Sequence, residues 1–223
     1  MKLMYALWGS SLDSVLSAPE CREALRAAGA TRLQVNVDDA DVAPAKLRIT
    51  TFDTPVRAVL SVWTEDGDPA EISHVVAGLA ERGAGWEVEE RTPLVPPSMA
   101  DGARCPALAQ MGFLRIPAEL DSAEWLHRWQ GLHTSVAIET QATFGYVQNR
   151  VLRTVLGSDR VDALVEELFP MAAMTDRHAF YGSGGDDAEL RRRLGLMIES
   201  VTRFGAHTNL DVVPTSRYVY DLA

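Results

Sequence analysis

Apolar residues recur with the spacing of an α-helix in four segments of the chain. The clearest example follows i, i+3, i+4, i+7, at Ile72, Val75, Val76 and Leu79. Each segment begins with a residue that can cap a helix, three positions before a glutamate: Ser17, Asp68, Asp121 and Asp186. A glycine lies near each end. The patterns predict helices near residues 17–28, 68–82, 121–131 and 186–204. The third could continue past Gly131, because residues 132–141 contain no strong helix breaker.

Shorter runs between these segments alternate apolar and polar residues, or are rich in valine and aromatic residues. They predict strands at residues 3–8, 32–37, 56–63, 86–90, 108–116, 143–151, 161–168, and 218–220 or the neighbouring 210–213. The run at 161–168 also fits a helix. The predicted elements follow the order β-α-β-β-α-β twice.

This order predicts an α+β fold made of tandem, duplicated ferredoxin-like units whose two sheets face each other. Residues 1–92 would form the first unit and residues 106–223 the second. Residues 93–105 would form the linker, because they contain Pro93, Pro96, Pro97 and Gly102. The space between each sheet and its helices is a natural place for a pocket.

Composition narrows the choice of partner and compartment. The 223 residues carry a net charge of −10, which would repel phosphate backbones, so we expect no nucleic-acid partner. Two cysteines form neither a disulfide framework nor the paired pattern of a zinc site. No apolar run is long enough to span a membrane, and no signal-peptide cleavage pattern follows the N-terminus. We therefore expect a cytoplasmic protein without membrane contact.

The residues best suited to catalysis or ligand binding are concentrated between positions 121 and 151. This stretch contains two of the five histidines and two of the five tryptophans, Trp125 and Trp129. Seven polar residues of the stretch could bind a ligand: Thr134, Glu139, Thr140, Gln141, Tyr146, Gln148 and Asn149. On the predicted strand, Tyr146 and Gln148 are two residues apart and would face the same side.

The second half of the chain resembles the EthD-like proteins of the dimeric α/β-barrel superfamily. The resemblance covers roughly residues 105–223. It rests on the helix with Trp125 and Trp129 that leads into Leu132-His133-Thr134, on the strand 146–149, on the segment 161–169 ending in Phe169, and on Ala179-Phe180-Tyr181. The likeness implies a dimeric-α/β-barrel-like core and a cavity for a hydrophobic, often aromatic molecule.

The resemblance also implies that His133 faces this cavity, where an imidazole could shuttle protons near neutral pH. His127 is six residues away and would point elsewhere on a regular helix, so the pair is not expected to bind a metal. Glu166 and Glu167 alternate on a predicted strand, and only one of them can face inward. A carboxylate buried there would have a raised pKa and could accept a proton. Glu139 is more simply a solvated charge at a helix end.

The leading hypothesis is a cofactor-free acid/base enzyme, such as a dehydratase, decarboxylase or isomerase, acting on a hydrophobic aromatic or polycyclic carbonyl or phenolic compound. His133 and Tyr146 are the predicted catalytic residues. The predicted substrate-binding residues are Trp125, Trp129, Glu139, Gln148, Glu166 and Phe169. No metal or cofactor is expected. The alternatives are a binding protein without turnover and a haem- or oxygen-dependent oxidoreductase on the same scaffold. A homodimer is also conceivable, since barrel edges can pair.

Overall fold

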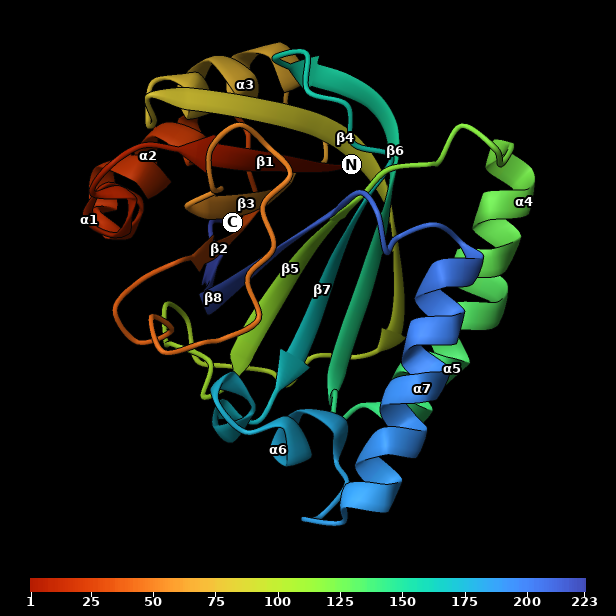
Figure 1. Cartoon of the computed structure of the whole chain (residues 1–223). Coiled ribbons are helices and arrows are strands. Elements are labelled where there is room, and N and C mark those ends of the chain that lie inside the picture. Colours follow the sequence, from red (N-terminus) through yellow and green to blue (C-terminus); the bar gives the residue numbers. More distant parts are fainter.

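The computed structural model describes residues 1–223 and shows an α+β protein built around one closed barrel of antiparallel strands (Figure 1). The strand order around the barrel is β1-β3-β2-β8-β5-β7-β6-β4. The strands are β1 (Lys2–Trp8), β2 (Arg32–Val37), β3 (Ala58–Trp63), β4 (Arg82–Leu94), β5 (Leu108–Leu114), β6 (Gly145–Leu156), β7 (Ala163–Phe169) and β8 (Leu210–Asp221). The α+β prediction is confirmed.

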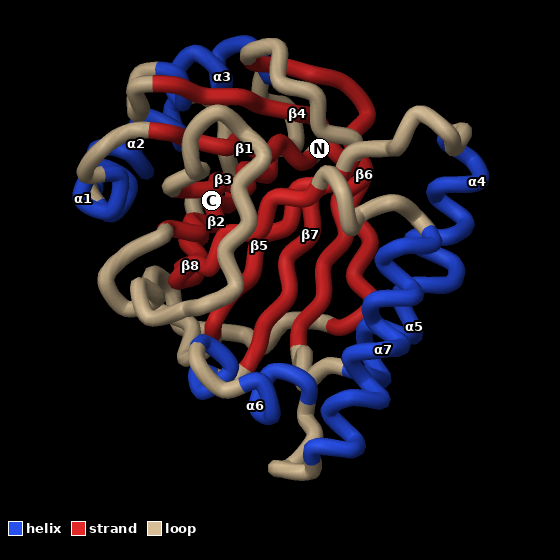
Figure 2. Tube along the Cα trace, viewed as in Figure 1, coloured by secondary structure: helices blue, strands red, loops and turns tan.

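Helices cover two separate parts of the barrel's outer surface (Figures 1 and 2). On the N-terminal side these are α1 (Leu12–Ser17), α2 (Pro19–Ala27) and α3 (Pro69–Ala77). On the C-terminal side they are α4 (Ser122–Leu126), the π-helix η1 (His127–His133), α5 (Thr134–Thr140) and α7 (Asp187–Arg203), with the 3-10 helix η2 (Met171–Met174) and α6 (Arg177–Tyr181) at one end of the barrel. No helix is both long and apolar enough to cross a membrane.

Alternate residues of each strand point into the barrel or out toward the helices. On β1, Leu3, Tyr5 and Leu7 pack with the N-terminal helices, whereas Met4 and Ala6 pack inside the barrel. Because both faces of the strand are covered, all seven residues of β1 are buried. A strand of this kind loses the apolar–polar alternation of a half-exposed strand.

Three of the four predicted helix caps are confirmed. The side chains of Asp68, Asp121 and Asp186 each accept a hydrogen bond from a backbone N–H in the first turn of α3, α4 and α7. The prediction for Ser17 is wrong. Ser17 is the last residue of α1, and α2 begins at Pro19 after an extended Ala18, without a side-chain cap.

Two segment boundaries also differ from the prediction. The helix predicted over 68–82 ends at Ala77, and β4 already begins at Arg82. β4 then continues to Leu94, past the start of the predicted linker, because its second half pairs with β6 of the other half of the chain. The segment 161–168, which also fitted a helix, is the strand β7, and β8 includes both of the alternative last strands.

Candidate functional site

The outer face of β5, β6 and β7 and the C-terminal helices enclose a cavity of about 190 Å³, which we call the helix-side cavity. Fifteen of its twenty lining residues are hydrophobic. The volume equals that of about six water molecules at ~30 Å³ each, so the cavity in this conformation has room for a small ring compound. It lies where the sequence predicted a pocket, between the sheet and the helices of the second half.

A row of polar side chains crosses the sheet at the floor of this cavity. Glu167 on β7 lies directly opposite Gln110 on β5 and Tyr146 on β6 in the strand register. All three line the cavity. Directly opposed residues have Cβ atoms about 5 Å apart, so these polar groups can act on one ligand.

Several polar atoms around the cavity have no hydrogen-bond partner within the protein. Five buried side-chain N or O atoms in the whole chain are unpaired, and three of them belong to residues that line this cavity: Gln110 Oε1, Gln141 Oε1 and Glu167 Oε1. Buried polar atoms are normally paired, because an unpaired one costs about 1–3 kcal/mol. Three unpaired acceptors around one apolar cavity indicate a place where a ligand supplies the missing donors.

Glu167 is the titratable group best suited to proton transfer at neutral pH. Burial raises the pKa of its carboxyl from 4.5 to about 7. A general base is most effective when its pKa lies near the working pH. Near neutral pH the Glu167 carboxyl therefore exists in both protonation states in substantial amounts.

His133 also lines the cavity, as the resemblance implied. Its Nδ1 lies 2.9 Å from Ser200 Oγ on α7, its ring packs on Phe204, and Nε2 has no hydrogen-bond partner. Burial lowers the pKa of His133 to about 4. The imidazole is therefore neutral at pH 7, which makes it a hydrogen-bonding group rather than a cation in this site.

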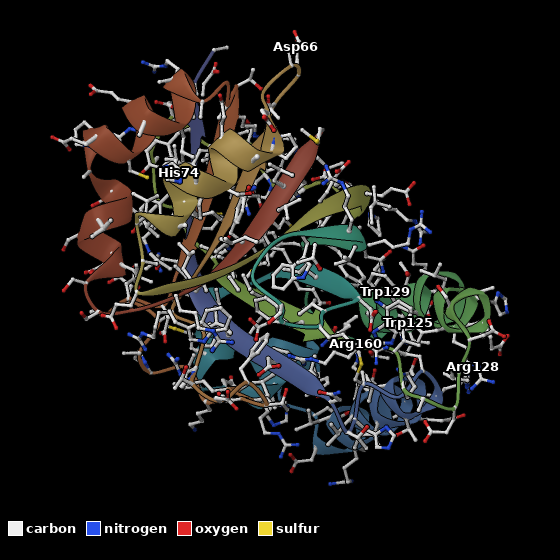
Figure 3. All side chains as sticks on the ribbon, turned by 90° about the horizontal axis from the view of Figure 1, so that it is seen from above. Asp66, His74, Trp125, Arg128, Trp129 and Arg160 are labelled. Atoms are coloured by element: carbon white, nitrogen blue, oxygen red, sulfur yellow. The ribbon has the colours of Figure 1, made fainter.

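The π-helix η1 positions the aromatic wall beside the cavity. Trp125 at the end of α4 and Trp129 and His133 in η1 are spaced four residues apart and are all buried. Residues four apart lie on one face of a helix, so the three side chains share the face that packs on the sheet. The two indoles lie 4.9 Å apart between centroids, whereas Arg128 in the same turn points away from the sheet (Figure 3).

Gln148 does not line the cavity but holds the side chains of Tyr146 and Thr134 in place. Its Nε2 donates to the Tyr146 hydroxyl and to Thr134 Oγ1, both at 3.0 Å, and its Oε1 accepts from Arg91. The Tyr146 hydroxyl is an acceptor in its bond with Gln148, so its own proton is free to be donated. Burial raises the pKa of Tyr146, so the phenol keeps that proton at neutral pH.

A segment of the N-terminal half, residues 46–52, crosses to the second half and forms one wall of the helix-side cavity. We call it the strap. Leu47 and Ile49 line the cavity, and Ile49 forms an antiparallel bridge with Val212 of β8. Asp211 holds the end of the strap by accepting hydrogen bonds from the backbone N–H groups of Thr51 and Phe52.

The structure brings together only part of the predicted site. His133, Tyr146, Trp129 and Phe169 line the helix-side cavity. Trp125 is buried behind Trp129, and Glu139 is exposed on α5. The side-chain amide of Gln148 is hydrogen-bonded to other protein groups and does not line the cavity. Glu166 points into the barrel, on the opposite face from His133, and pairs with Arg217. His127 is exposed whereas His133 is buried, so the two point in different directions, as predicted.

Glu167 is the most prominent residue of the cavity, but it was not part of the site predicted from the sequence. The alternation of Glu166 and Glu167 correctly placed them on opposite faces, but both faces of β7 carry large apolar residues, so the pattern favours neither. Gln141 was among the polar residues that could bind a ligand but was not assigned to the predicted site, and Gln110 had no local signal. Their relevance depends on strand register and on tertiary packing.

The lining residues of the cavity do not form a metal-ion site, and the cavity volume is too small for a haem. No cluster of three histidine, cysteine, aspartate or glutamate side chains is present. The cavity is also smaller than the ~300–1,000 Å³ of most small-molecule sites, and a haem macrocycle does not fit its present shape.

Comparison with solved structures identifies the fold. An anthrone oxidase-like protein matches 100% of this chain and 92% of its own, with a TM-score of 0.56 and 10% sequence identity. A proposed monooxygenase from Lactobacillus acidophilus NCFM matches 100% of this chain and 96% of its own at 9% identity, with a TM-score of 0.48. The sequence matches no protein-family model and no curated protein. Together with the closed antiparallel barrel, the first of these similarities defines a fold of the dimeric α/β-barrel type.

A shape-conserving change at His133 tests its role. His133→Phe should keep the packing on Phe204 but remove both ring nitrogens. We expect the fold to remain and the rate of any reaction in the helix-side cavity to fall at least ~10-fold, as is common when a positioned polar group is lost. Thermal unfolding and turnover of the same preparation would check this, and an unchanged rate would remove His133 from the site.

Proposed function

We propose that the chain is an enzyme that removes a proton from a small hydroxylated or keto aromatic compound bound in the helix-side cavity. The observation that carries this proposal is the unpaired Glu167 carboxyl, whose pKa burial raises to about 7, directly opposite Tyr146 in an apolar cavity. Perturbed carboxyls in clefts are typical of catalytic sites.

In the proposed mechanism the ring system lies against Trp129 and Phe169. Glu167 Oε1 accepts the proton from an acidic C–H or O–H of the substrate. The electron pair left behind moves onto the substrate oxygen, forming an enolate or phenolate. The Tyr146 hydroxyl, and His133 Nε2 when Ser200 donates to Nδ1, stabilise that oxygen with hydrogen bonds. Return of the proton to another atom completes an isomerisation. In a dehydration the enolate expels a β-hydroxyl group, which takes the proton from Glu167 and leaves as water. In a decarboxylation the bond to CO₂ breaks in place of the C–H bond, its electron pair moves onto the same oxygen, and a proton from the protonated Glu167 carboxyl then goes to that carbon.

The size of the cavity limits the substrate. At the packing density of protein interiors, ~0.74, a cavity of 190 Å³ is filled by a molecule of about 140 Å³, which corresponds to one or two fused rings. Larger polycyclic compounds would fit only if the strap moved away from the helices. We therefore propose two-ring compounds as the first substrates to test.

The second candidate is an oxygen-dependent oxidation that begins with the same proton transfer. The similarity in fold to an anthrone oxidase-like protein favours it. The carbanion formed at a ring CH₂ would react with O₂. The CH₂ would become C=O with one oxygen atom, and the other oxygen atom would leave as water with the two displaced hydrogens. A binding protein that uses the cavity without turnover is the remaining alternative.

The family and the domain organisation of the chain are also part of the proposal. We propose that the chain is EthD-like, and that residues 1–92 and 106–223 are two ferredoxin-like units of a duplicated chain joined by residues 93–105. The order β-α-β-β-α-β in both halves supports this. Within each half, the strand neighbours are also equivalent, β4-β1-β3-β2 and β8-β5-β7-β6. A cytoplasmic location and a homodimer remain proposals.

Hydrogen–deuterium exchange tests the proton transfer without knowledge of the final product. 2-Tetralone, a two-ring ketone with an acidic CH₂, would be incubated with the protein in D₂O and followed by NMR. We expect the protein to accelerate exchange at that carbon over buffer alone. Parallel samples with and without O₂ distinguish the two candidates, because only the oxidation consumes the ketone and O₂. If a panel of such ketones and naphthols binds with no exchange and no product, the binding protein is correct instead.

A further inference from the structure

The inside of the barrel is divided into an apolar end and a charged end. Trp8, Trp86 and Phe113 pack together at the apolar end. At the other end, polar side chains from six strands point inward: Lys2, Gln34, Asn36, Glu90, Asn149, Glu166 and Arg217. Lys2, Glu166 and Arg217 are each more than nine-tenths buried. Burial of three charged groups is costly unless each has close partners.

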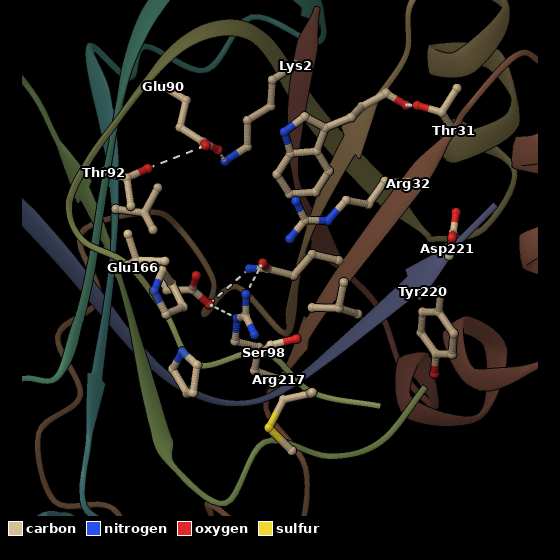
Figure 4. Close-up of a pocket in the computed structure, with 18 residues that line it drawn as sticks. Lys2, Thr31, Arg32, Glu90, Thr92, Ser98, Glu166, Arg217, Tyr220 and Asp221 are labelled. Atoms are coloured by element: carbon tan, nitrogen blue, oxygen red, sulfur yellow. Dashed lines mark hydrogen bonds and ion pairs between the residues drawn. The ribbon is translucent and has the colours of Figure 1, made fainter. Parts of the chain in front are cut away.

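These groups border a second cavity of about 650 Å³, which we call the barrel-mouth pocket. Figure 4 shows its charged side chains converging from different strands, with Lys2 and Glu90 on one side and Glu166 and Arg217 on the other. The segment between β4 and β5 covers the opening with Pro96, Pro97 and Ser98. The volume is within the ~300–1,000 Å³ range of small-molecule sites.

The hydrogen bonds around Glu166 and Arg217 leave one atom of each available. Glu166 Oε1 accepts from Gln34, Asn36 and Arg217 at 2.9–3.1 Å, whereas Oε2 accepts from no protein group. Arg217 uses Nε for Glu166 and Nη2 for Gln34, whereas Nη1 donates to no protein group. A carboxylate oxygen and a guanidinium nitrogen with free capacity therefore lie next to each other in the wall of the pocket.

Lys2 supplies another donor on the opposite wall. Its ammonium group bonds to Glu90 and to Asn149, at 2.5 and 2.7 Å, so one of its three N–H groups is free. The charged lining residues balance: Lys2, Arg32 and Arg217 are cations, and Glu90, Glu166 and Asp221 are anions. A ligand with only one charge would leave that charge uncompensated, whereas a ligand with one carboxylate and one ammonium group would preserve the balance.

We propose that the barrel-mouth pocket is a second ligand site, separate from the helix-side cavity, that binds a small zwitterion of the α-amino-acid type. The ligand carboxylate would accept hydrogen bonds from Arg217 Nη1 and Lys2. Its ammonium group would donate to Glu166 Oε2. The apolar lining residues Val147 and Val219, with Met99 of the covering segment, offer contact for a side chain.

Calorimetric titration of the full chain with the proteinogenic L-amino acids tests the proposal. We expect at least one to bind with a Kd below ~1 mM, which corresponds to about −4 kcal/mol. Two analogues of that amino acid, one without the amino group and one without the carboxylate, should each bind at least tenfold more weakly. No binding of any amino acid at ~10 mM, or equal binding of both analogues, would overturn the proposal.

Two variants locate the site. Arg217→Gln removes the free guanidinium donor and should weaken binding at least tenfold. Because Arg217 also supports the buried network, Ser98→Trp is needed as a variant that fills the pocket from the exposed covering segment without breaking any hydrogen bond of that network. Ser135→Trp, at an exposed position on α5, is the matched control and should bind normally. Undiminished binding in a folded Ser98→Trp protein would show that the ligand binds elsewhere.

Discussion

Glu167→Gln is expected to lower the rate of proton transfer in the helix-side cavity by ~10²–10⁴-fold, the usual contribution of a general base. Glutamine has nearly the same shape as glutamate but cannot accept the proton. The deuterium-exchange assay measures this loss directly. Glu139→Gln is the matched control, because Glu139 is exposed on α5, and its rate should equal that of the wild type.

The same substitution should stabilise the fold at alkaline pH. The pKa of Glu167 is raised from 4.5 to about 7, so the folded protein binds this proton more tightly than the unfolded chain. The wild type therefore loses stability as the pH rises from about 4.5 to about 7, by at most ~3 kcal/mol, and glutamine removes this loss. Urea unfolding at pH 5 and pH 8 would show it. A variant that loses both activity and stability at pH 8 would indicate a structural role for Glu167.

Asp211→Ala should cause the largest loss of stability, about 3–5 kcal/mol, because it leaves a buried charged partner alone. The Asp211 carboxylate is buried, accepts from Arg115 at 2.7 Å, and also holds Thr51 and Phe52 of the strap. Without it, the guanidinium of Arg115 keeps only weaker acceptors.

This substitution should also alter the choice of ligand. A less firmly held strap would let Leu47 and Ile49 move and would widen the cavity, so three-ring ketones should gain affinity relative to two-ring ketones. Denaturant unfolding and ligand titrations would measure both effects. Asn209→Ala is the control, since Asn209 is exposed and makes only a 3.5 Å contact with Thr51. A loss below ~1 kcal/mol for Asp211→Ala would mean that the ion pair behaves like a surface pair.

Local patterns predicted most of the fold. Capping aspartates and helical spacing located α3, α4 and α7, because these signals depend on neighbouring residues alone. The end of α3 was missed because Gly83 suggested a longer helix, whereas pairing with β1 makes residues 82–88 a strand. The π-helix was also missed. Its residues make tertiary contacts that no local pattern encodes, such as the hydrogen bond from Arg91 on β4 to the Gln130 carbonyl.

The site was predictable only in part, because some of its residues are brought together by tertiary contacts rather than by local sequence. A tryptophan-rich helix followed by His133 indicated the correct face of the second half. The strand register that sets Gln110, Glu167 and Tyr146 in one row is a long-range property, and no spacing along the chain encodes it. Glu166, chosen at the sequence level, instead belongs to the charged network inside the barrel.

The pH dependence of exchange catalysed by the wild-type protein tests the central claim most directly. If Glu167 is the base, the rate should rise with pH through an apparent pKa near 7 and then level off, because only the ionised carboxylate accepts a proton. Glu167→Gln should abolish this rise. A rate that levels off already above pH 5, or a profile that Glu167→Gln leaves unchanged, would contradict the assignment of Glu167 as the base.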